Sequence, residues 1–350
     1  MALLSLLRVL PPKNETGAHI LANASAPTLA TEARRHGLSA VLQDALERSG
    51  VTWRSEHQDA LRRDSFAVIA NGLRVRALLF STLDVLAKVD VFPVLLKGYG
   101  FGLRYYPDPL FRPTFDVDLL IGENDWVRAD RALQELGLRP PERAAVLYHR
   151  QHHHHVHYGG APGSVELHFR PFTGLGGALN ASGYLERARE GRIEGRAVRY
   201  LSPTDECRYL ALHAAGHLFA RLSWLYDLKL LLAQTPVDWD AMAHESQRDG
   251  LARATGIAFH VLERALDVRT EANRFRTSKT SPAWVDRAFS DERLEKSAWA
   301  NSKWPAFGLT LLLSDGMTNR FLHLGHHGLR GLRRRASRTF PSLVPEIWRG

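Results

Sequence analysis

Cysteine is almost absent from this sequence of 350 residues, which contains only Cys207. A single cysteine excludes an intrachain disulfide and any metal site made of several thiolates. The scarcity of cysteine fits a reducing compartment, so we expect a cytoplasmic protein. Cys207 itself lies in a helical pattern of apolar residues, which predicts a thiol packed in the core.

Long apolar runs are also missing. Residues 1–12 are largely apolar, but this stretch is too short to span a bilayer and lacks a basic leader and a clear cleavage site. Its spacing predicts an amphipathic helix that ends at Pro11 and Pro12. No other run is long enough to cross a membrane, so we expect no membrane span.

Acidic residues are fewer than basic ones, with 37 Asp and Glu against 46 Lys and Arg and a formal net charge of +9. A basic surplus fits an anionic ligand such as a nucleotide or a nucleic acid, and it is equally typical of an Arg-rich genome. With 45% apolar and 24% charged residues, the composition is that of a globular protein. The length indicates two domains, or one domain with a large extension.

Helical spacing of apolar residues dominates both ends of the sequence. It predicts helices over residues 30–49, 57–87, 124–138, 203–220, 222–233, 238–249, 251–266 and 304–313. Asn124 is the expected N-cap of the third of these helices, and Ser202, followed by a proline, is the expected N-cap of the fourth. Residues 272–282 are polar and are expected to form a loop.

Two carboxylates lie two residues apart in an otherwise apolar strand pattern at residues 115–120. The side chains of a strand alternate between its faces, so Asp116 and Asp118 project side by side. Two neighbouring acids repel each other and resist burial, and a hard divalent cation is the usual reason for such a pair. The simpler alternative is an exposed strand face with two solvated acids. The apolar neighbours favour metal binding.

Residues 148–169 predict a β-hairpin, because residues 159–163 form a turn signal between two strand-like arms. The second arm carries Glu166 and His168 on one face. Glu166 is therefore a third carboxylate that can reach the strand of the acidic pair. His168 is either a residue that orients a metal ligand or a hydrogen-bonded strand histidine.

Histidines fill the first arm of this hairpin, in the run from His152 to His157. Alternation puts the odd-numbered and even-numbered imidazoles of the run on opposite faces. An imidazole-rich strand can bind zinc or nickel, whereas the simpler interpretation is a strand near the active cleft. His213 and His217 have the i, i+4 spacing of metal ligands on a helix, but their apolar neighbours favour core histidines.

Lys97 and Gly98 end an apolar strand pattern that precedes the acidic pair. Glycine lets the backbone approach a phosphate closely. Lys97, Arg104 and Arg112 are cations near enough in the sequence to neutralise phosphate charge. The predicted nucleotide-binding residues are therefore Lys97, Gly98, Arg104, Arg112 and His168.

Three carboxylates on neighbouring strands are a typical arrangement for phosphoryl chemistry. Two metal ions held by shared carboxylates can bind a triphosphate and activate an attacking hydroxyl. Asp116 and Asp118 would bridge both ions, and Glu166 would hold the ion that activates the nucleophile. These three acids are the predicted catalytic and metal-binding residues. Mg²⁺ is the expected metal, with Mn²⁺ as an alternative.

This ordered set of motifs resembles the uncharacterised bacterial nucleotidyltransferases that carry an LKG motif, a family within the superfamily with a polymerase β-type palm. The resemblance covers roughly residues 80–266 and rests on Leu96-Lys97-Gly98, Tyr106-Pro107, Arg112, residues 115–120, Val165-Glu166-Leu167-His168, His213, His217 and residues 221–228 and 238–240. The wider superfamily has Gly-Ser after its first strand, where this chain has Lys97-Gly98-Tyr99. Either Lys97 or Arg112 is then left to hold the γ-phosphate.

The resemblance implies an α/β (α+β) fold, with a polymerase β-type mixed sheet, flanking helices and a C-terminal helical domain. We expect an N-terminal helical segment over residues 1–79 and a catalytic domain over residues 80–195. A helical domain over residues 196–325 and a basic tail over residues 326–350 would follow.

The implied reaction is transfer of a nucleoside monophosphate from an NTP to an unidentified acceptor hydroxyl, with release of pyrophosphate. Two other functions stay open. A toxin-like nucleotidyltransferase would modify a tRNA or a protein, and the basic residues 326–350 would favour RNA as a partner. A non-catalytic nucleotide-binding module of a biosynthetic complex would bind NTP without turnover, which the presence of all three carboxylates argues against.

Overall fold

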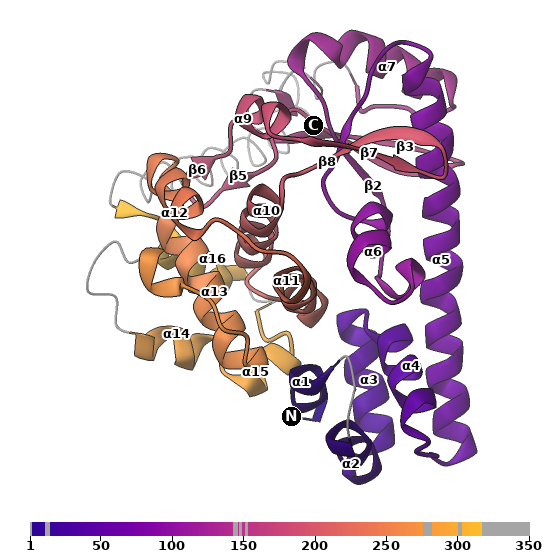
Figure 1. Cartoon of the computed structure of the whole chain (residues 1–350), viewed down its shortest axis with the longest axis vertical. Coiled ribbons are helices and arrows are strands. Elements are labelled where there is room, and N and C mark those ends of the chain that lie inside the picture. Colours follow the sequence, from indigo (N-terminus) through magenta and orange to yellow (C-terminus); the bar gives the residue numbers. More distant parts are fainter. Residues whose placement is uncertain are drawn as a thin grey trace, which may run out of the picture.

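The computed structural model describes residues 2–10, 15–142, 146, 149–150, 153–275, 282–299 and 303–316. A six-stranded mixed sheet lies between the long N-terminal helix α5 (Ser55–Ala87) and a set of C-terminal helices, and the helices of residues 2–49 lie below the sheet in Figure 1. The mixed α/β architecture expected from the sequence is confirmed. The predicted basic tail, residues 326–350, lies outside the described residues.

The central sheet has the strand order β3-β4-β2-β1-β8-β7. β2 runs parallel to β4 and antiparallel to β1, while β1 runs parallel to β8. A separate two-stranded sheet pairs β5 with β6. The strands are β1 (Val94–Leu95), β2 (Val117–Leu120), β3 (His155–Gly160), β4 (Gly163–His168), β5 (Thr173–Gly174), β6 (Gly177–Ala178), β7 (Arg189–Ile193) and β8 (Arg196–Tyr200).

Two antiparallel hairpins form the edges of the sheet. The predicted hairpin is confirmed as β3-β4, although part of its predicted first arm, including His152, lies outside the described residues. The β7-β8 hairpin is not indicated by the sequence, because its strands are rich in charge and carry glycine. The predicted end of the catalytic domain at residue 195 falls inside this hairpin, and β8 continues the sheet to Tyr200.

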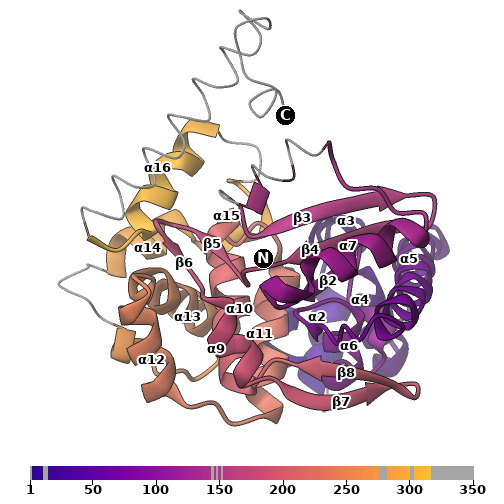
Figure 2. The same cartoon turned by 90° about the horizontal axis from the view of Figure 1, so that it is seen from above.

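The two faces of the sheet have different partners. α5 (Ser55–Ala87) and α7 (Trp126–Glu135) share one apolar cluster with Val117 and Leu119 of β2. Side chains alternate along β2, so Asp118 lies on the opposite face. That face belongs to a second cluster, built with α6 (Tyr99–Tyr105) and the C-terminal helices. Figure 2 shows the sheet between α5 on one side and α10 to α13, within residues 203–266, on the other.

The helix predicted over residues 57–87 is confirmed as α5, whereas the single helix predicted over residues 30–49 is wrong. The chain forms α3 (Ala26–His36) and α4 (Ser39–Ser49), which are separated at Gly37. Gly37 has a left-handed φ of 72° that ends α3. A Cβ at this position would lie 2.8 Å from Pro113 Cγ, so only glycine permits this close contact with the loop before β2.

α7 begins later than the sequence predicts. The short 3-10 helix η2 (Glu123–Asp125) precedes it, so Asp125 stands at the N-cap position in place of Asn124. The polar residues that look like the first turn of a longer α-helix are therefore wound more tightly.

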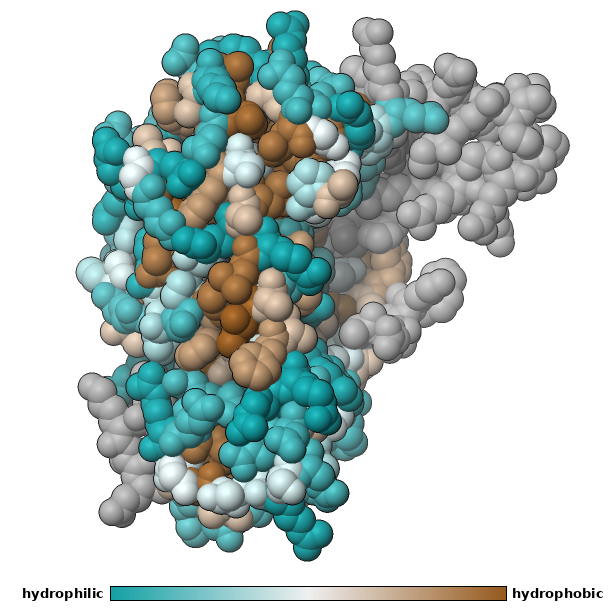
Figure 3. Space-filling model, turned by 90° about the vertical axis from the view of Figure 1, so that its right-hand side faces the viewer, coloured by the Kyte–Doolittle hydropathy of each residue, from teal (hydrophilic) through white to brown (hydrophobic). Residues whose placement is uncertain are grey.

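Among the described residues, α5 is long and apolar enough to cross a membrane, judged by length and composition alone. The sequence had led us to expect no membrane span. The indication is weak, because a helix of a protein core passes the same test and α5 packs on α4, α7 and the sheet. Its Phe66 and Leu73 side chains are 61% and 46% exposed. Figure 3 shows apolar patches on the side of the molecule where α5 lies.

Helices predicted in the C-terminal half are confirmed as α10 (Pro203–Gly216), α11 (Leu222–Gln234), α12 (Trp239–Arg248), α13 (Ala252–Leu266) and α16 (Lys303–Leu313). Ser202 caps α10 as predicted, since its hydroxyl accepts a 3.2 Å hydrogen bond from the Asp205 N–H. Cys207 is buried in the core, as predicted. The predicted loop over residues 272–282 is wrong in part, because η3 (Ala272–Phe275) begins it and α14 (Pro282–Ala288) starts at its end.

Helices from the two ends of the chain share one apolar core. The predicted N-terminal helix is confirmed as α1 (Ala2–Val9), although the prolines expected to end it lie outside the described residues. Arg8 of α1 forms a 2.7 Å ion pair with Asp291 of α15 (Asp291–Glu295). The segments predicted as separate N-terminal and C-terminal helical regions are thus packed together. The remaining described helices include α2 (Glu15–Asn23), α6 (Tyr99–Tyr105), η1 (Pro109–Phe111) and α9 (Ala181–Glu186).

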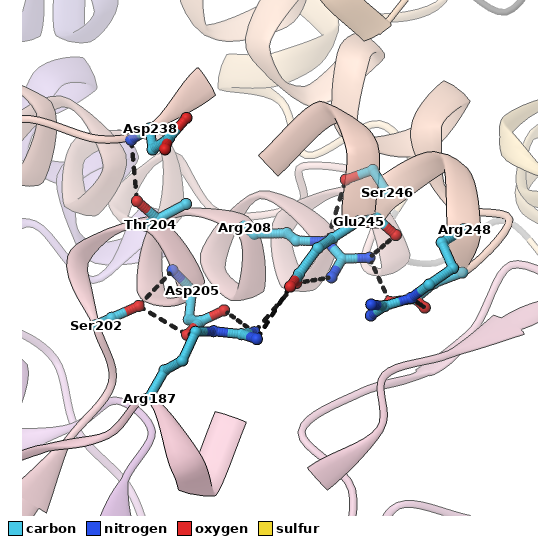
Figure 4. Close-up of polar contacts among 10 residues, drawn as sticks. Arg187, Ser202, Thr204, Asp205, Arg208, Asp238, Glu245, Ser246 and Arg248 are labelled. Atoms are coloured by element: carbon cyan, nitrogen blue, oxygen red, sulfur yellow. Dashed lines mark hydrogen bonds and ion pairs between the residues drawn. The ribbon is translucent and has the colours of Figure 1, made fainter. Parts of the chain in front are cut away.

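A polar network holds α10 against its neighbours (Figure 4). Arg187, which follows α9, lies 2.7 Å from Asp205 and 3.0 Å from Glu245. Arg208 of α10 is buried and lies 3.2 Å from Glu245 and 2.7 Å from Asp249. A buried guanidinium requires paired charge, so these contacts fix the position of α10 relative to α12. This position matters for function, because α10 also approaches the carboxylates of the sheet.

Candidate active site

Carboxylates from adjacent strands meet on the sheet face opposite α5. The parallel pairing of β2 with β4 places Asp118 directly beside Glu166, as expected from the sequence. Asp116 immediately precedes β2, close enough for its charge to interact with both of these acids. Asp118 is buried, whereas Asp116 and Glu166 are partly exposed. The three predicted catalytic acids therefore form one cluster that solvent reaches from one side.

Two nitrogen donors contact the buried Asp118 carboxylate. Lys97 Nζ and His168 Nε2 each lie 3.2 Å from Asp118 Oδ1. The second oxygen, Oδ2, is buried and has no hydrogen-bond partner among the described residues. Leaving a buried acceptor unsatisfied costs about 1–3 kcal/mol. Oδ2 is therefore a natural position for a bound ligand or ion.

The two aspartates titrate differently. Burial and the neighbouring Asp118 raise the pKa of Asp116 to about 7, although Lys97 counteracts part of the effect. Burial also acts to raise the pKa of Asp118, but Lys97 and His168 outweigh it and hold this pKa well below its usual range. Near neutral pH, Asp118 is thus ionised while Asp116 is only partly so. A bound cation would favour the ionised form of Asp116.

Lys97 and Gly98 connect β1 to α6. Gly98 has a φ of 74° and a ψ of −144°, a conformation that essentially only glycine adopts, and it turns the chain from the strand into the helix. The turn leaves Lys97 against Asp118, which raises the pKa of the Lys97 ammonium even though burial acts to lower it. A small pocket reaches this point, and apolar residues of α5 and the sheet form much of its wall. It is lined by Val75, Leu79, Leu95, Lys97, Gly98, Tyr99, Asp116, Val117 and Asp118. Nucleotide binding by Lys97 and Gly98 stays a prediction, and both residues lie where it requires.

His168, at the end of β4, is buried and lies between the two acids of the sheet. Its Nε2 is 3.2 Å from Asp118 Oδ1 and 3.5 Å from Glu166 Oε2. Burial acts to lower the pKa of His168, but the hydrogen bonds to both acids outweigh it and raise the pKa. This geometry agrees with either interpretation drawn from the sequence, because a hydrogen-bonded strand histidine here also orients both carboxylates. Its predicted contact with a nucleotide stays untested.

Two cations predicted to bind the nucleotide lie in ion pairs with buried acids. The guanidinium of Arg104 makes a 2.9 Å hydrogen bond to Glu206 of α10. Arg112 bonds to Asp227 of α11 through two nitrogens, at 3.1 Å and 2.8 Å. These pairs tie α6 and the loop before β2 to the C-terminal helices. We therefore leave Arg104 and Arg112 out of the proposed site, and their nucleotide binding stays a prediction.

α10 and α11 bring side chains to the site that the sequence does not assign to it. Tyr209 and His213 lie near Lys97, since burial and Lys97 both lower the pKa of His213, and Lys97 counteracts the burial that raises the pKa of Tyr209. His213 is half-buried and His217 is exposed, so the prediction of core histidines is wrong for His217. The Trp224 ring lies 5.0 Å from that of His213. The i, i+4 spacing of His213 and His217 was the one local signal that this helix could contribute to a site. The other side chains could not be predicted, because nothing in the sequence shows which face of α10 meets the sheet.

The donor set suits a hard divalent cation. Ligand atoms of Asp118, Glu166 and His168 lie within 4.8 Å of one another. Carboxylate oxygens are the ligands that Mg²⁺ and Mn²⁺ prefer, and the unpartnered Asp118 Oδ2 is one of them. Asp116 is not a member of this group of three. Its predicted role in bridging two ions therefore stays a prediction.

Comparison with known protein families identifies the group to which this geometry belongs. The family model described as uncharacterised nucleotidyltransferase matches residues 23–267. The chain belongs to this family. It is therefore a nucleotidyltransferase, a transferase enzyme with an NTP substrate, and the resemblance drawn from its motifs is confirmed. Comparisons with curated proteins and with solved structures give no match.

The family match has two consequences for the expectations drawn from the sequence. It begins at residue 23, so this nucleotidyltransferase family includes α3, α4 and the whole of α5 in addition to the sheet. It also identifies an enzyme, which argues against the non-catalytic nucleotide-binding alternative. The family name specifies neither the acceptor nor the metal.

Proposed function

We propose that this nucleotidyltransferase is a metal-dependent, cytoplasmic enzyme that transfers a nucleoside monophosphate from an NTP to an acceptor hydroxyl and releases pyrophosphate. One observation carries the proposal. Asp118 and Glu166 lie side by side on adjacent parallel strands, and Asp118 keeps a buried oxygen without a partner among the described residues. This pairing of carboxylate oxygens is suited to cation-assisted phosphoryl transfer.

The residues that would hold the cation are Asp118, Glu166 and His168, which form the group of neighbouring ligand atoms. Asp116 would join them once it loses its proton. Mg²⁺ is the proposed metal, with Mn²⁺ as an alternative, because both prefer carboxylate oxygens. When bound, the cation would supply Lewis-acid stabilisation of the phosphate charge.

The acceptor proton is assigned to Glu166. Its side chain is 20% exposed, so an acceptor can approach it from solvent, whereas Asp118 is buried and already contacts Lys97 and His168. Glu166 would take the proton as the acceptor oxygen forms a bond to the α-phosphorus. The bond from that phosphorus to the bridging oxygen breaks, and pyrophosphate leaves with the bonding electrons. Lys97 supplies positive charge beside this centre and is proposed to hold the departing phosphates.

Transfer of label from NTP tests the proposal. The purified enzyme is incubated with each of the four NTPs labelled at the α-phosphate, together with Mg²⁺ or Mn²⁺ and with separate fractions of cellular RNA, protein and small molecules. We expect one fraction to gain label and pyrophosphate to accumulate, with neither occurring in EDTA. Asp118→Asn and Glu166→Gln should each lower the rate at least about 100-fold, since each removes charge on which the transition state depends.

Glu135→Gln is the matched control, because Glu135 is an exposed acid at the end of α7, away from the site. It should leave the rate unchanged. Full activity of Asp118→Asn would refute the mechanism. The labelled fraction also separates the acceptor classes: label in tRNA or protein would identify the toxin-like alternative, whose basic residues 326–350 lie outside the described structure.

A further inference from the structure

Three imidazoles gather at the edge of the carboxylate cluster. His155 of β3 pairs with His168 of β4 across the hairpin, and His154 immediately precedes β3. The ring of His154 lies 4.5 Å from that of His155 and 5.4 Å from that of His168. One ligand nitrogen from each of the three falls within 4.8 Å of the others. This histidine cluster, His154, His155 and His168, has no role in the proposed transfer beyond the contribution of His168.

Two of the imidazoles in the cluster have the same bonding pattern. His155 Nε2 lies 3.5 Å from Glu166 Oε1, and His168 Nε2 lies 3.2 Å from Asp118 Oδ1. The other nitrogen of each ring, Nδ1, is buried and has no hydrogen-bond partner among the described residues. Histidines that bind a metal ion commonly use one nitrogen for the metal and the other for a carboxylate. The carboxylate half of that arrangement is present as a hydrogen bond for His168 and as a longer contact of 3.5 Å for His155.

We propose that His154, His155 and His168 form a binding site for Zn²⁺ or a similar transition-metal ion, adjacent to the oxygen-rich Mg²⁺ site, with His168 between the two. Imidazole nitrogen is a good ligand for zinc, nickel, copper and cobalt, whereas Mg²⁺ favours oxygen. Three histidines leave a fourth tetrahedral position open for water or a ligand. The inference concerns metal binding and does not depend on the proposed nucleotide transfer.

The position of the histidine cluster makes the site accessible. His154 and His155 are half-buried, so an ion can reach them from solvent, while His168 is buried beneath them. His155 and His168 are on the same antiparallel pair of strands, which holds them in register. The two buried Nδ1 atoms are each costly while unsatisfied, and a bound cation would satisfy both. If the three imidazoles only packed against one another, the cost of the two unsatisfied Nδ1 atoms would remain.

Cobalt provides a direct optical test, because tetrahedral Co²⁺ absorbs strongly in the visible range and octahedral Co²⁺ only weakly. The full-length protein, without an affinity tag and stripped of metals with EDTA that is then removed, is titrated with Co²⁺ in a large excess of Mg²⁺. We expect tetrahedral absorption that saturates at one equivalent and is abolished by one equivalent of Zn²⁺. His154→Ala and His155→Ala should each weaken Co²⁺ binding at least about 10-fold, since each removes a direct ligand.

His157→Ala is the matched control. His157 lies on β3 two residues beyond His155, and its exposed ring bonds to Ser164 and is not part of the cluster. This variant should bind Co²⁺ like the wild type. Circular dichroism and melting in EDTA establish that each variant is folded, and His168 is left unchanged because it is buried.

Three results would overturn the proposal. The first is the absence of tetrahedral Co²⁺ absorption. The second is wild-type affinity in both His154→Ala and His155→Ala. The third is an equal loss in His157→Ala, which would mean that the run of histidines chelates metal without a built site. The two proposals can fail separately. If the protein gives the tetrahedral Co²⁺ absorption and transfers no label from any NTP, the histidine site is supported and the proposed function is rejected.

Discussion

Lys97 Nζ lies 3.2 Å from Asp118 Oδ1, and the Asp118 side chain is completely buried. A carboxylate in such surroundings stays ionised only when positive charge compensates for lost hydration. Lys97 provides that charge directly, since it is the largest of the influences that lower the pKa of Asp118. A divalent cation bound to Asp118 would provide the same compensation. Lys97 and the cation are therefore partly interchangeable in stabilising the fold.

This relationship predicts how Lys97→Met behaves without and with Mg²⁺. In EDTA the variant should lose about 3 kcal/mol in free energy of unfolding, because the buried Asp118 is left with only His168 as a partner. Saturating Mg²⁺ should restore a large part of that loss and should stabilise the variant more than the wild type. Urea unfolding at neutral pH measures both effects. Lys88→Met is the control, since Lys88 is exposed just after α5 and should change neither value.

The double variant Lys97→Met/Asp118→Asn separates charge from packing. If the unpaired carboxylate causes the loss, neutralising it should recover stability in EDTA. A double variant as unstable as Lys97→Met would mean that the lysine side chain contributes through its packing.

A second prediction follows from the pKa of Asp116, which burial and Asp118 raise to about 7 from an ordinary value of 3.8. The folded protein therefore holds this proton more tightly than the unfolded chain does. The stability that Asp116 contributes is present below about pH 4 and is lost as the pH rises through about 7. Asp116→Asn should remove this loss. Allowing for the partial exposure of Asp116, the variant should exceed the wild type by about 1–2 kcal/mol at about pH 8 in EDTA, and by less at about pH 5.

Urea unfolding of both proteins across that pH range provides the measurement. Mg²⁺ affinity of the wild type should increase over the same range, since the ion and the proton compete for Asp116. A stability difference that does not change with pH would show that Asp116 has an ordinary pKa.

The positions of the acids could be predicted from the sequence because the relevant pattern is local. Alternation along two short strands puts Asp118 and Glu166 on one face, and the turn at residues 159–163 fixes the hairpin that carries Glu166. The motif order then identified the family. Neither argument needs any knowledge of distant contacts, which is why both were confirmed.

The partners of the cations could not be predicted, because they lie far away in the sequence. Arg112 pairs with Asp227 at a separation of 115 residues, and Arg104 with Glu206 at 102. Near the acidic pair, both arginines resemble phosphate ligands, and only the packing of α10 and α11 against the sheet shows otherwise. The break at Gly37 was missed for the same reason, since the need for glycine comes partly from the distant Pro113.

A third prediction separates structural from nucleotide-binding roles of Arg112. Arg112→Met should lower the free energy of unfolding by about 3–5 kcal/mol, because Asp227 would stay buried with only the Tyr106 hydroxyl as a partner. The double variant Arg112→Met/Asp227→Leu should recover most of this loss, since it leaves no buried charge. Urea unfolding measures both. In the transfer assay, the double variant should keep the wild-type KM for NTP. A KM raised about 10-fold in a stable double variant would instead assign the γ-phosphate to Arg112.

The last prediction compares two glycines that share a positive φ and differ in ψ. Gly50 has a φ of 69° and a ψ of 4°, the left-handed helical region, where alanine should cost about 1–2 kcal/mol in free energy of unfolding. Gly98 has a φ of 74° and a ψ of −144°, a region that essentially only glycine adopts, so alanine should cost about 2–3 kcal/mol there. Neither substitution meets a severe clash, because a Cβ at Gly50 has no atom within 4 Å and a Cβ at Gly98 lies 3.4 Å from Thr114 Cγ2. Urea unfolding should therefore give a larger loss for Gly98→Ala than for Gly50→Ala, and both variants should stay folded in the transfer assay.

The two substitutions should differ in nucleotide transfer. Gly98 makes the turn that places Lys97 against Asp118, whereas Gly50 ends α4 away from the carboxylates. A shift of about 1 Å in a reacting group can cost about 100-fold in rate, so Gly98→Ala should lower the rate of label transfer about 10-fold or more while Gly50→Ala leaves it unchanged. Equal losses of rate would trace the effect to stability alone. Full activity in Gly98→Ala would mean that the site tolerates a different backbone at this turn, and that Lys97 is positioned by its contact with Asp118 instead.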